Sequence, residues 1–414
     1  MSISFACEVN RVAKRHVERR ADALADAAGR WRDADFAPRV RATRGIIERT
    51  GYTQPVVDYA LDRLFGAIGR DVVLATIEQE LGSLDALERF VPRDARPAVM
   101  YRGDLRVAIV SSDTTIGVAI PSLVFALCAG ANVVVKDRED HLVASFVETL
   151  RTEDPELAAR VRTATWRGAD DSATRAQLGE AQTVVAFGRD ESLAAIRAML
   201  APATRFVAFA HRTSIGYVTR ETLGDETAAK TAARGAALDA LLYDGDGCLS
   251  LHALFVERGA LLEPAAFGAL VAQACDTVEI EFPPSRERSV ATTAYRRAAH
   301  FRAAQGEGAA LGTGSGRYLL VLDPPRSEPP PFLPRTLALY AVDGPQEMLA
   351  FVLHHALPLE AVAVSEERAD IREAAIASSA SRLAPLGALQ APPLGGEHGG
   401  VERILPFVRA IYRA

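Results

Sequence analysis

The 414-residue sequence predicts an α/β protein with a helical N-terminal region. Residues 1 to about 100 repeat an amphipathic, helix-like spacing of apolar side chains, and no strand-like run interrupts them before Arg106. From Leu105 onward, short apolar runs typical of buried strands alternate with longer helical segments, a pattern of parallel sheets covered by helices. At this length we expect two domains of ordinary size rather than one.

The composition excludes several classes of protein. A hydrophobic fraction of 49% is ample for a packed core. A net charge of -6 and a pI near 5.8 give no basic footprint, so we expect no nucleic-acid partner. No apolar run approaches the ~20 residues of a membrane helix, and we see no signal peptide. Four dispersed cysteines indicate neither a disulfide framework nor a zinc site, so a reduced, cytoplasmic protein without a metal is expected.

Four organisational segments are expected. Residues 1–104 form the helical region, with helices at Val12 to Leu24, Arg41 to Glu48, Pro55 to Phe65 and Asp71 to Glu80. Residues 105–243 form a Rossmann-like nucleotide-binding domain. Its strands are expected at 107–110, 131–136, 183–187, 205–210 and 215–219, and its helices at 114–129, 191–200 and 225–243.

Residues 244–391 are expected to form a second, catalytic α/β domain. Strands are predicted at 251–257, 278–282, 318–322, 337–342 and 361–365, and helices at 264–274, 293–305, 345–354 and 369–379. Six prolines between Pro324 and Pro334 predict an exposed loop. Residues 392–414 are expected to be a glycine- and proline-rich loop followed by a helix at Val401 to Tyr412.

A glycine-rich run at Gly312 to Gly316 looks like a phosphate loop but precedes a strand. A dinucleotide fingerprint requires a strand before it and a helix after it, so we interpret this run as a turn. Cys128 and Cys275 lie in apolar helical segments and are expected to be core residues. Cys248 differs, because it follows the polar turn Asp244 to Gly247 and precedes a new strand. A thiol in such a turn can be a nucleophile, although a buried structural cysteine is the default interpretation.

Lysine is rare in this chain. The 47 basic residues are 44 arginines and three lysines, at positions 14, 136 and 230. Lys136 stands at the carboxyl end of a predicted strand, where open α/β sheets bind ligands. It could contact a nucleotide ribose or phosphate, or it could be an ordinary solvated lysine.

Together these residues resemble the LuxC-type acyl-CoA reductases of the aldehyde dehydrogenase superfamily. The resemblance rests on stretches that occur in the family's order: Leu127 to Lys136, Val184 to Glu191, Asp246 to Ser250, Leu386 to Gln390 and Glu397 to Gly400. It extends from about residue 100 to the end of the chain and implies an aldehyde-dehydrogenase-like fold.

The resemblance implies NADPH-dependent reduction of an acyl thioester, either an acyl-CoA or an acyl carrier protein, to an aldehyde. Cys248 would form the acyl-enzyme, and its backbone N–H would be one oxyanion donor. Lys136, Gly188, Arg189 and Ser192 would bind the cofactor. His398 could orient the substrate or donate a proton, or it could be a solvated loop residue. A homo-oligomer or a complex with a partner biosynthetic enzyme would also be in keeping with the family.

Three positions depart from the relatives' patterns. Asp113 stands where the family has an asparagine oxyanion donor, so a protonated Asp113 or a hydroxyl such as that of Thr114 would have to substitute. The usual His-Asp-Gly appears as His398-Gly399-Gly400. The stretch Phe206 to Ser214 lacks the glutamate base of aldehyde-oxidising relatives, which favours thioester reduction. Two alternatives stay open: an acyl-phosphate reductase, or a scaffold with impaired catalysis that binds an acyl carrier or partner enzyme.

Overall fold

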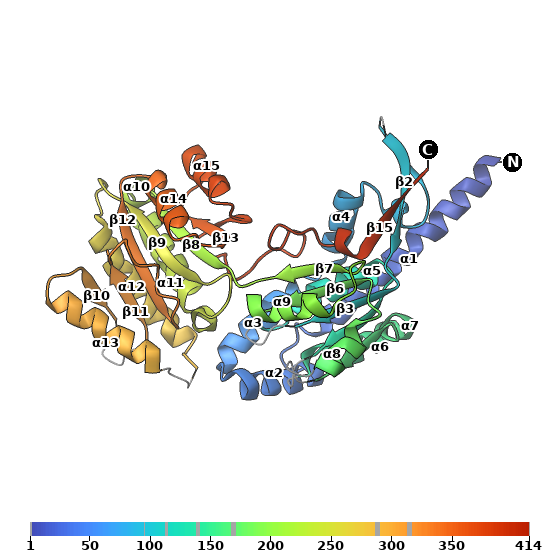
Figure 1. Cartoon of the computed structure of the whole chain (residues 1–414), viewed down its shortest axis with the longest axis horizontal. Helices are drawn as coiled ribbons and strands as arrows, with labels where there is room; N and C mark the ends of the chain where they lie inside the picture. Colours follow the sequence, from blue (N-terminus) through green and yellow to red (C-terminus); the bar gives the residue numbers. More distant parts are fainter. Residues whose placement is uncertain are drawn as a thin grey trace. The chain divides into compact units, whose positions relative to one another are not determined.

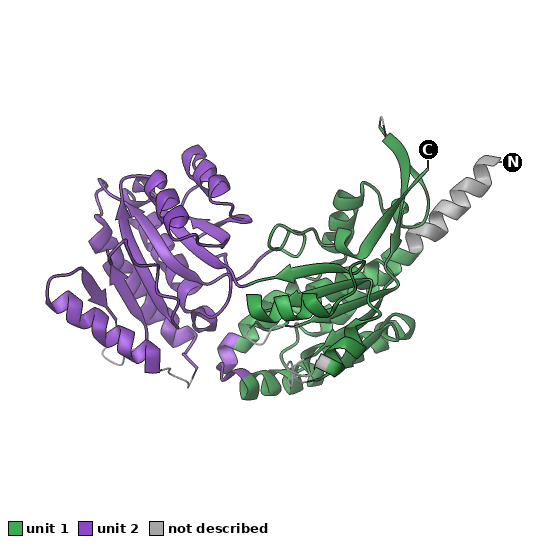
Figure 2. Ribbon diagram, viewed as in Figure 1, with its two compact units in different colours: residues 1–49, 57–210, 393–414 green, residues 50–56, 211–392 purple. Residues whose placement is uncertain are grey.

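A computed structural model describes residues 2–94, 96–111, 115–137, 141–166, 171–285, 290–312 and 317–413. The chain divides into two compact units (Figure 2). Unit 1 comprises Met1–Arg49, Val57–Ala210 and Pro393–Ala414, and unit 2 comprises Thr50–Val56 and His211–Pro392.

Unit 1 contains a five-stranded parallel sheet of the Rossmann type (Figure 1). Its order is β5 (Val161–Ala164), β4 (Asn132–Lys136), β3 (Arg106–Val110), β6 (Thr183–Phe187) and β7 (Arg205–Phe209). The chain runs outward from β3 through β4 to β5, and then returns to the other side of β3 with β6. The strand order therefore reverses between β3 and β6, and ligands of open α/β sheets bind outside the carboxyl ends of strands at such a point.

Helices cover both faces of this sheet. Val110, Val184 and Ala186 point to one face and pack against α8 (Asp171–Leu178) and α9 (Asp190–Met199). The remaining helices of this part are α5 (Ala119–Cys128), α6 (Leu142–Glu153) and the short α7 (Pro155–Ala158). Eight of the ten residues of α5 are buried, which explains its almost wholly apolar sequence.

The expected helical N-terminal region is present. It contains α1 (Ser2–Arg30), α2 (Ala37–Thr50), α3 (Gln54–Gly66), α4 (Arg70–Leu81) and the 3₁₀ turn η1 (Leu84–Leu87). The rings of Trp31 and Phe65 lie 4.5 Å apart, and Phe65 is 5.4 Å from Phe146 of α6. The Trp31 indole also donates to Thr149 Oγ1 at 3.1 Å. These contacts join the helical region to the Rossmann-type part of unit 1.

Two expectations for the chain ends are wrong. Residues up to 104 include the strands β1 (Val91–Arg93) and β2 (Arg96–Gly103), and the end of the chain is strand β15 (Val408–Arg413) after the 3₁₀ turn η3 (Leu405–Phe407) rather than a helix. The three strands form one sheet in which β2 and β15 are antiparallel. Pro406 interrupts helical bonding, and the ladder to β2 then satisfies the terminal backbone groups.

Unit 2 contains a seven-stranded sheet. Its order is β10 (Ala309–Leu311), β11 (Leu319–Leu322), β12 (Thr336–Val342), β9 (Leu251–Glu257), β8 (Thr213–Val218), β13 (Leu359–Val364) and β14 (Arg382–Pro385). All neighbouring strands are parallel except β10, which is antiparallel to β11. The expected mixed α/β character is therefore confirmed for both units.

Two helical layers bury the faces of this sheet. One core contains α11 (Glu226–Leu241) and α12 (Pro264–Glu281), and the other contains α14 (Pro345–His354) and α15 (Ala369–Ala377). The unit also has α10 (Arg220–Leu223), η2 (Leu242–Gly245) and α13 (Val290–Ala304). The proline-rich segment lies between β11 and β12 outside any helix or strand, as expected.

Two further expectations differ from the structure. β8 hydrogen-bonds to β9 and β13, so the division between the units falls at residues 210 and 211, whereas the expected domain boundary is at 243 and 244. The strand expected at 278–282 is the end of α12. Phe267, Val271, Cys275 and Val278 are all buried at helical spacing, so this periodicity extends through the short apolar run.

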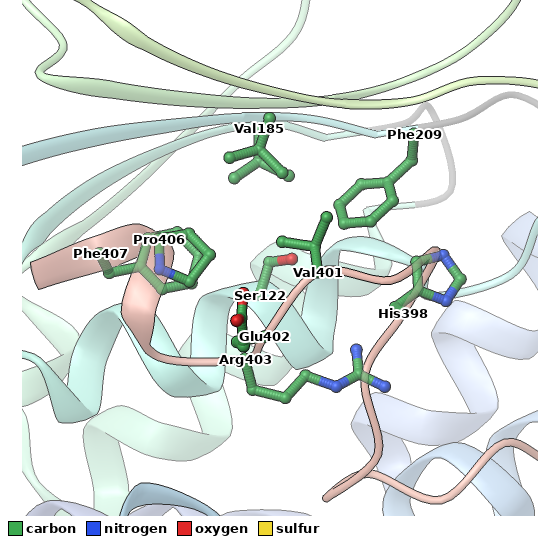
Figure 3. Close-up of a pocket in the computed structure, with 10 residues that line it drawn as sticks. Ser122, Val185, Phe209, His398, Val401, Glu402, Arg403, Pro406 and Phe407 are labelled. Carbon is green, nitrogen blue, oxygen red and sulfur yellow. The ribbon is translucent and has the colours of Figure 1, made fainter. Parts of the chain in front are cut away.

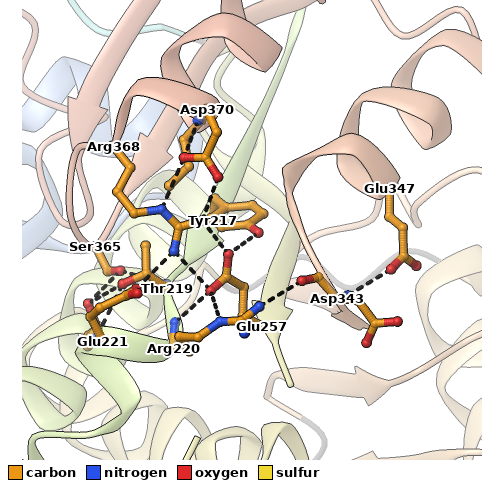
Figure 4. A network of polar contacts seen from close by, with 12 residues as sticks. Tyr217, Thr219, Arg220, Glu221, Glu257, Asp343, Glu347, Ser365, Arg368 and Asp370 are labelled. Atoms are coloured by element: carbon orange, nitrogen blue, oxygen red, sulfur yellow. Dashed lines mark hydrogen bonds and ion pairs between the residues drawn. The ribbon is translucent and has the colours of Figure 1, made fainter. Parts of the chain in front are cut away.

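The carboxyl ends of the unit 2 strands are closed by an ionic network around Glu257 (Figure 4). This fully buried carboxylate accepts hydrogen bonds from Tyr217, Arg220 and Arg368 at 2.6–3.1 Å. Burial favours the neutral acid, but these donors lower the pKa of Glu257 to about 2. Paired side chains thus occupy the edge of the sheet at the carboxyl ends of these strands, whereas Cys248 lies at the edge formed by their amino ends.

Candidate functional site

Cys248 lies in the loop between η2 and β9, at the amino end of that strand. It is half-buried, whereas Cys128 and Cys275 are buried, as expected for core residues. Cys128 ends α5, and Cys275 belongs to the core between α12 and the sheet. Among the cysteines whose side chains the structure describes, Cys248 is therefore the most accessible.

A strained turn precedes Cys248. Tyr243, Asp244 and Gly245 have φ values of 54°, 55° and 76°, in the left-handed region that costs non-glycine residues about 1–2 kcal/mol each. Arg335 braces this turn, because its Nη1 lies 3.1 Å from Asp244 Oδ1 and its backbone N–H donates to the Asp244 carbonyl at 2.8 Å. The backbone N–H of Ser285 donates to the other Asp244 oxygen at 3.0 Å.

Hydrogen bonds fix the peptide groups on both sides of the thiol. The Gly247 carbonyl accepts from the backbone N–H of Ser250 at 2.9 Å. The Cys248 carbonyl accepts from the hydroxyl of Ser214, on β8, at 2.9 Å. In a planar trans peptide the N–H points opposite to the C=O, so these two bonds set the directions of the N–H groups of Cys248 and Leu249.

The pKa of the Cys248 thiol is raised to about 12, chiefly by burial and in part by the carboxylate of Glu360. The N–H groups of Cys248 and Leu249, together with Arg212, favour the thiolate and oppose this shift. Arg212 also lies 3.8 Å from the buried Glu360 carboxylate, so part of its charge is already paired. Without substrate, this arrangement keeps the group as a thiol at neutral pH.

The expected second oxyanion donors, Asp113 and Thr114, lie outside the described residues, as do positions 313–316 of the glycine-rich run. Sequence reasoning missed Ser214 and Arg335, which fix the loop that carries Cys248, and the buried Asp239, which binds the loop of residues 386–390. These contacts join distant parts of the sequence, so no local motif marks them. Among the described residues, no group of three or more His, Cys, Asp or Glu could hold a metal ion.

Lys136 ends β4 at the carboxyl edge of the unit 1 sheet. Its Nζ lies 5.1 Å from the ring centre of Trp166, and burial lowers its pKa. No ion pair joins this amine to a carboxylate among the residues that the structure describes. A half-buried cation at this edge fits a phosphate or ribose of a dinucleotide.

Gly188 and Arg189 connect β6 to α9, and Ser192 lies in the first turn of α9, at the same carboxyl edge of the sheet. Gly188 donates its N–H to the Phe209 carbonyl at 3.2 Å, and Arg189 is the N-cap of α9. The first turn of α9 also carries Asp190 and Glu191. These two carboxylates already complement the helix dipole, so Arg189 is the residue here that would attract an anion.

His398 lies against the ring of Phe209 at the end of β7 (Figure 3) and also faces the ring of Phe187 at the end of β6. Its ring centre is 4.7 Å from that of Phe209 and 6.2 Å from that of Phe187. Phe209 and His398, with Val185 and Val207, line a small pocket together with Ser122 of α5 and residues 401–403, 406 and 407. His398 therefore belongs to unit 1 and Cys248 to unit 2, and the structure does not describe the two residues as one site.

Helices of the described chain are too short or too polar to cross a membrane. Solved structures of low sequence identity share the fold. An NAD-dependent benzaldehyde dehydrogenase from Corynebacterium glutamicum has a TM-score of 0.68 at 13% identity, and the match covers 98% of this chain and 88% of that chain. An oxidoreductase from Marinobacter aquaeolei gives 0.73 at 14% identity, with 95% and 85% covered.

A succinic semialdehyde dehydrogenase from Streptococcus pyogenes, solved with NADP+, gives a TM-score of 0.67 at 13% identity, with 100% of this chain and 96% of that chain covered. These likenesses confirm the aldehyde dehydrogenase fold. No curated protein matches the sequence. The family model for acyl-CoA reductase (LuxC) matches residues 12–410, nearly the whole chain. The chain therefore belongs to the LuxC family of acyl-CoA reductases.

Proposed function

We propose that the protein reduces an acyl thioester, an acyl-CoA or an acyl carrier protein, to an aldehyde with NADPH, through an acyl-enzyme on Cys248. Family membership supports the reaction class. The observation that carries the assignment to Cys248 is its loop, in which a half-buried thiol has two backbone N–H groups held in fixed directions beside it.

The first step is acyl transfer. The Cys248 thiolate attacks the thioester carbonyl carbon, a new S–C bond forms, and the carbonyl electron pair moves to the oxygen. The N–H groups of Cys248 and Leu249 are the donors available to this oxyanion. Collapse of the tetrahedral intermediate breaks the bond to the pantetheine sulfur, which leaves as a thiolate and takes up a proton.

Because burial raises the pKa of Cys248 to about 12, deprotonation must accompany substrate binding or attack. Arg212 lowers this pKa, whereas Glu360 raises it. A substrate that displaces the Glu360 carboxylate from Arg212 would leave the guanidinium to favour the thiolate. We assign this electrostatic role to Arg212.

The cofactor would supply a hydride to the acyl carbon when bound. The bond between that carbon and the Cys248 sulfur would then break, which would release the aldehyde and restore the Cys248 thiolate. Lys136, Gly188, Arg189 and Ser192 lie at the carboxyl edge of the Rossmann-type sheet, and Lys136 offers a half-buried cation for a ribose or phosphate. The segment from β7 to the start of β8 contains no carboxylate. No carboxylate base from this segment would activate water, which supports transfer of hydride rather than hydrolysis of the acyl-enzyme.

Product analysis tests this function. Wild type, Cys248→Ala and the control Cys275→Ala are incubated with NADPH and a panel of acyl-CoA substrates, and aldehyde, free CoA thiol and oxidised cofactor are measured. We expect equal amounts of all three from wild type and Cys275→Ala, and none from Cys248→Ala. Release of phosphate from acyl phosphates without activity on thioesters would favour an acyl-phosphate reductase. Absence of cofactor binding by fluorescence titration would favour a scaffold.

A further inference from the structure

The loop of residues 386–390 lies directly on helix α11 in unit 2. A side-chain carbon at Gly235 would lie 2.7 Å from the carbonyl carbon of Leu386, and one at Gly387 would lie 3.0 Å from the Cα of Gly235. Gly387 also has a φ of +88°, which side chains disfavour. Two glycines therefore allow the loop backbone to touch the helix backbone.

A buried carboxylate and a partly buried guanidinium hold this loop. The carboxylate of Asp239, on α11, is fully buried and accepts from the N–H of Gly387 at 2.6 Å and of Leu389 at 3.1 Å. The guanidinium of Arg382 donates to the carbonyls of Leu389 and Ala388 at 3.0 and 2.7 Å. The Asp239 carboxylate therefore binds N–H groups of the loop, and the Arg382 guanidinium binds its C=O groups. Together these bonds fix the backbone that leads into Gln390.

Gln390 connects this rigid loop to the loop of Cys248. Its side-chain amide donates to the hydroxyl oxygen of Ser250 at 3.0 Å and to the backbone carbonyl of Asp239 at 3.3 Å. The same Ser250 oxygen accepts from the N–H of Gly247 at 3.2 Å. The Ser250 backbone N–H in turn holds the Gly247 carbonyl.

The result is an unbroken path of hydrogen bonds. It runs from Asp239 through the 386–390 loop and Gln390 to Ser250 and Gly247, and so to the peptide whose N–H belongs to Cys248. None of these residues needs to touch the substrate to affect its reaction. A misplacement of about 1 Å in a catalytic donor can cost on the order of 100-fold in rate.

We propose that Gln390, held by Asp239, is a positioning residue that acts through Ser250 to aim the backbone N–H of Cys248 at the oxyanion of the acyl-transfer step. The inference rests on the proposed function, because it concerns the oxyanion of that reaction. It assigns a purpose to a buried carboxylate on α11 and to a glutamine 142 positions after the thiol, neither of which serves as nucleophile or proton donor.

Two reactions of the same thiol distinguish a loss of orientation of the Cys248 N–H from a general disturbance of the loop. Acyl transfer from a thioester develops an oxyanion, whereas alkylation by iodoacetamide displaces iodide at a saturated carbon and develops none. Loss of the aimed N–H should slow the first reaction much more than the second. Loss of the loop's fold, or of the thiol's accessibility, should change both.

The test compares wild type, Gln390→Met, Ser250→Ala and the double variant, each as the full chain. Ser378→Ala is the matched control, since it removes a buried hydroxyl that bonds Ala375 elsewhere in unit 2. Rates of thiol release from an acyl-CoA without NADPH are divided by iodoacetamide alkylation rates at the same pH. We expect this ratio to fall about tenfold or more in both single variants, and no further in the double variant.

The control should keep the wild-type ratio, and the Michaelis constant for the thioester should change little. Ser250→Ala removes only one oxygen atom and keeps the test decisive if Gln390→Met fails to fold. An unchanged ratio in the folded variants, or an equal fall in both rates, would overturn the inference while leaving the proposed function intact. A wild-type protein that forms no acyl-enzyme with any thioester would overturn the proposed function itself, and the inference with it.

Discussion

Replacing Arg335 by methionine tests how the turn before Cys248 is held. Arg335 is 3% exposed and Asp244 is 7% exposed, and the guanidinium also donates to the carbonyl of Phe282 at 3.1 Å. Removing one partner of a buried ion pair costs about 3–5 kcal/mol, because the other charge stays buried without it. The Arg335→Met variant would leave the Asp244 carboxylate in that position.

The expected loss of stability can be expressed as a melting shift. In a domain of roughly 150–250 residues, each kcal/mol shifts the melting temperature by about 2–4 °C, so we expect a fall on the order of 10 °C. Tyr243 and Asp244 also have left-handed backbone conformations, and the ion pair between Asp244 and Arg335 keeps them from relaxing. The turn should therefore relax, and acyl transfer to Cys248 should slow along with the loss of stability.

Thermal melting followed by circular dichroism measures the shift. Arg234→Met is the matched control, since Arg234 pairs with Glu281 at 2.9 Å on the surface of the same unit. Exposed pairs contribute roughly 0–1 kcal/mol, so this control should melt within a few degrees of wild type. The double variant Asp244→Asn/Arg335→Met should recover part of the loss, because no buried charge is left unpaired. Equal melting of Arg335→Met and Arg234→Met would refute the role given to the buried pair.

Three further predictions concern charge. Because the pKa of Cys248 is raised, the rate of its alkylation by iodoacetamide should increase about tenfold per pH unit from pH 8 to 10, whereas the rate for an ordinary thiol levels off near its pKa of about 8.5. The Glu360→Gln variant should react faster than wild type at pH 8. A plateau of the wild-type rate below pH 9 would contradict this prediction. Lys136→Ala should raise the apparent cofactor constant more than it lowers turnover in steady-state kinetics, and an unchanged constant would remove Lys136 from the site. Burial raises the pKa of Asp239 to about 7, so its contribution to stability is complete below about pH 4 and is lost as the pH rises through 7. Asp239→Asn should therefore melt with a flatter pH dependence between pH 4 and 7, and identical slopes would show that another group titrates.

Much of the fold could be predicted from sequence because local signals agree with the tertiary structure. The buried strands β3, β4 and β6 are short apolar runs between helical segments, and the helix Ala119–Cys128 is apolar on all sides because it is buried. Predictions failed where long-range pairing decides the structure. β15 forms because β2 offers it a partner about 300 residues earlier in the chain, which no local pattern reveals.

The candidate site likewise has a part that could be predicted from the sequence and a part that could not. The setting of Cys248 follows from its own neighbours, the polar glycine-containing turn before it and the strand after it. The residues that fix this loop are separated from it in sequence: Ser214 by 34 positions and Arg335, which pairs with Asp244, by 91. Their roles arise from sheet register and helix packing, so they emerge only once the fold is known.

The central claim is that Cys248 carries the acyl group. Its most direct test is mass spectrometry of the protein after incubation with a panel of acyl-CoA substrates in the absence of NADPH. We predict one acyl group per chain, located on the peptide that contains Cys248, with an equal amount of CoA released. An absence of any adduct on Cys248, together with aldehyde formation by Cys248→Ala, would contradict the account.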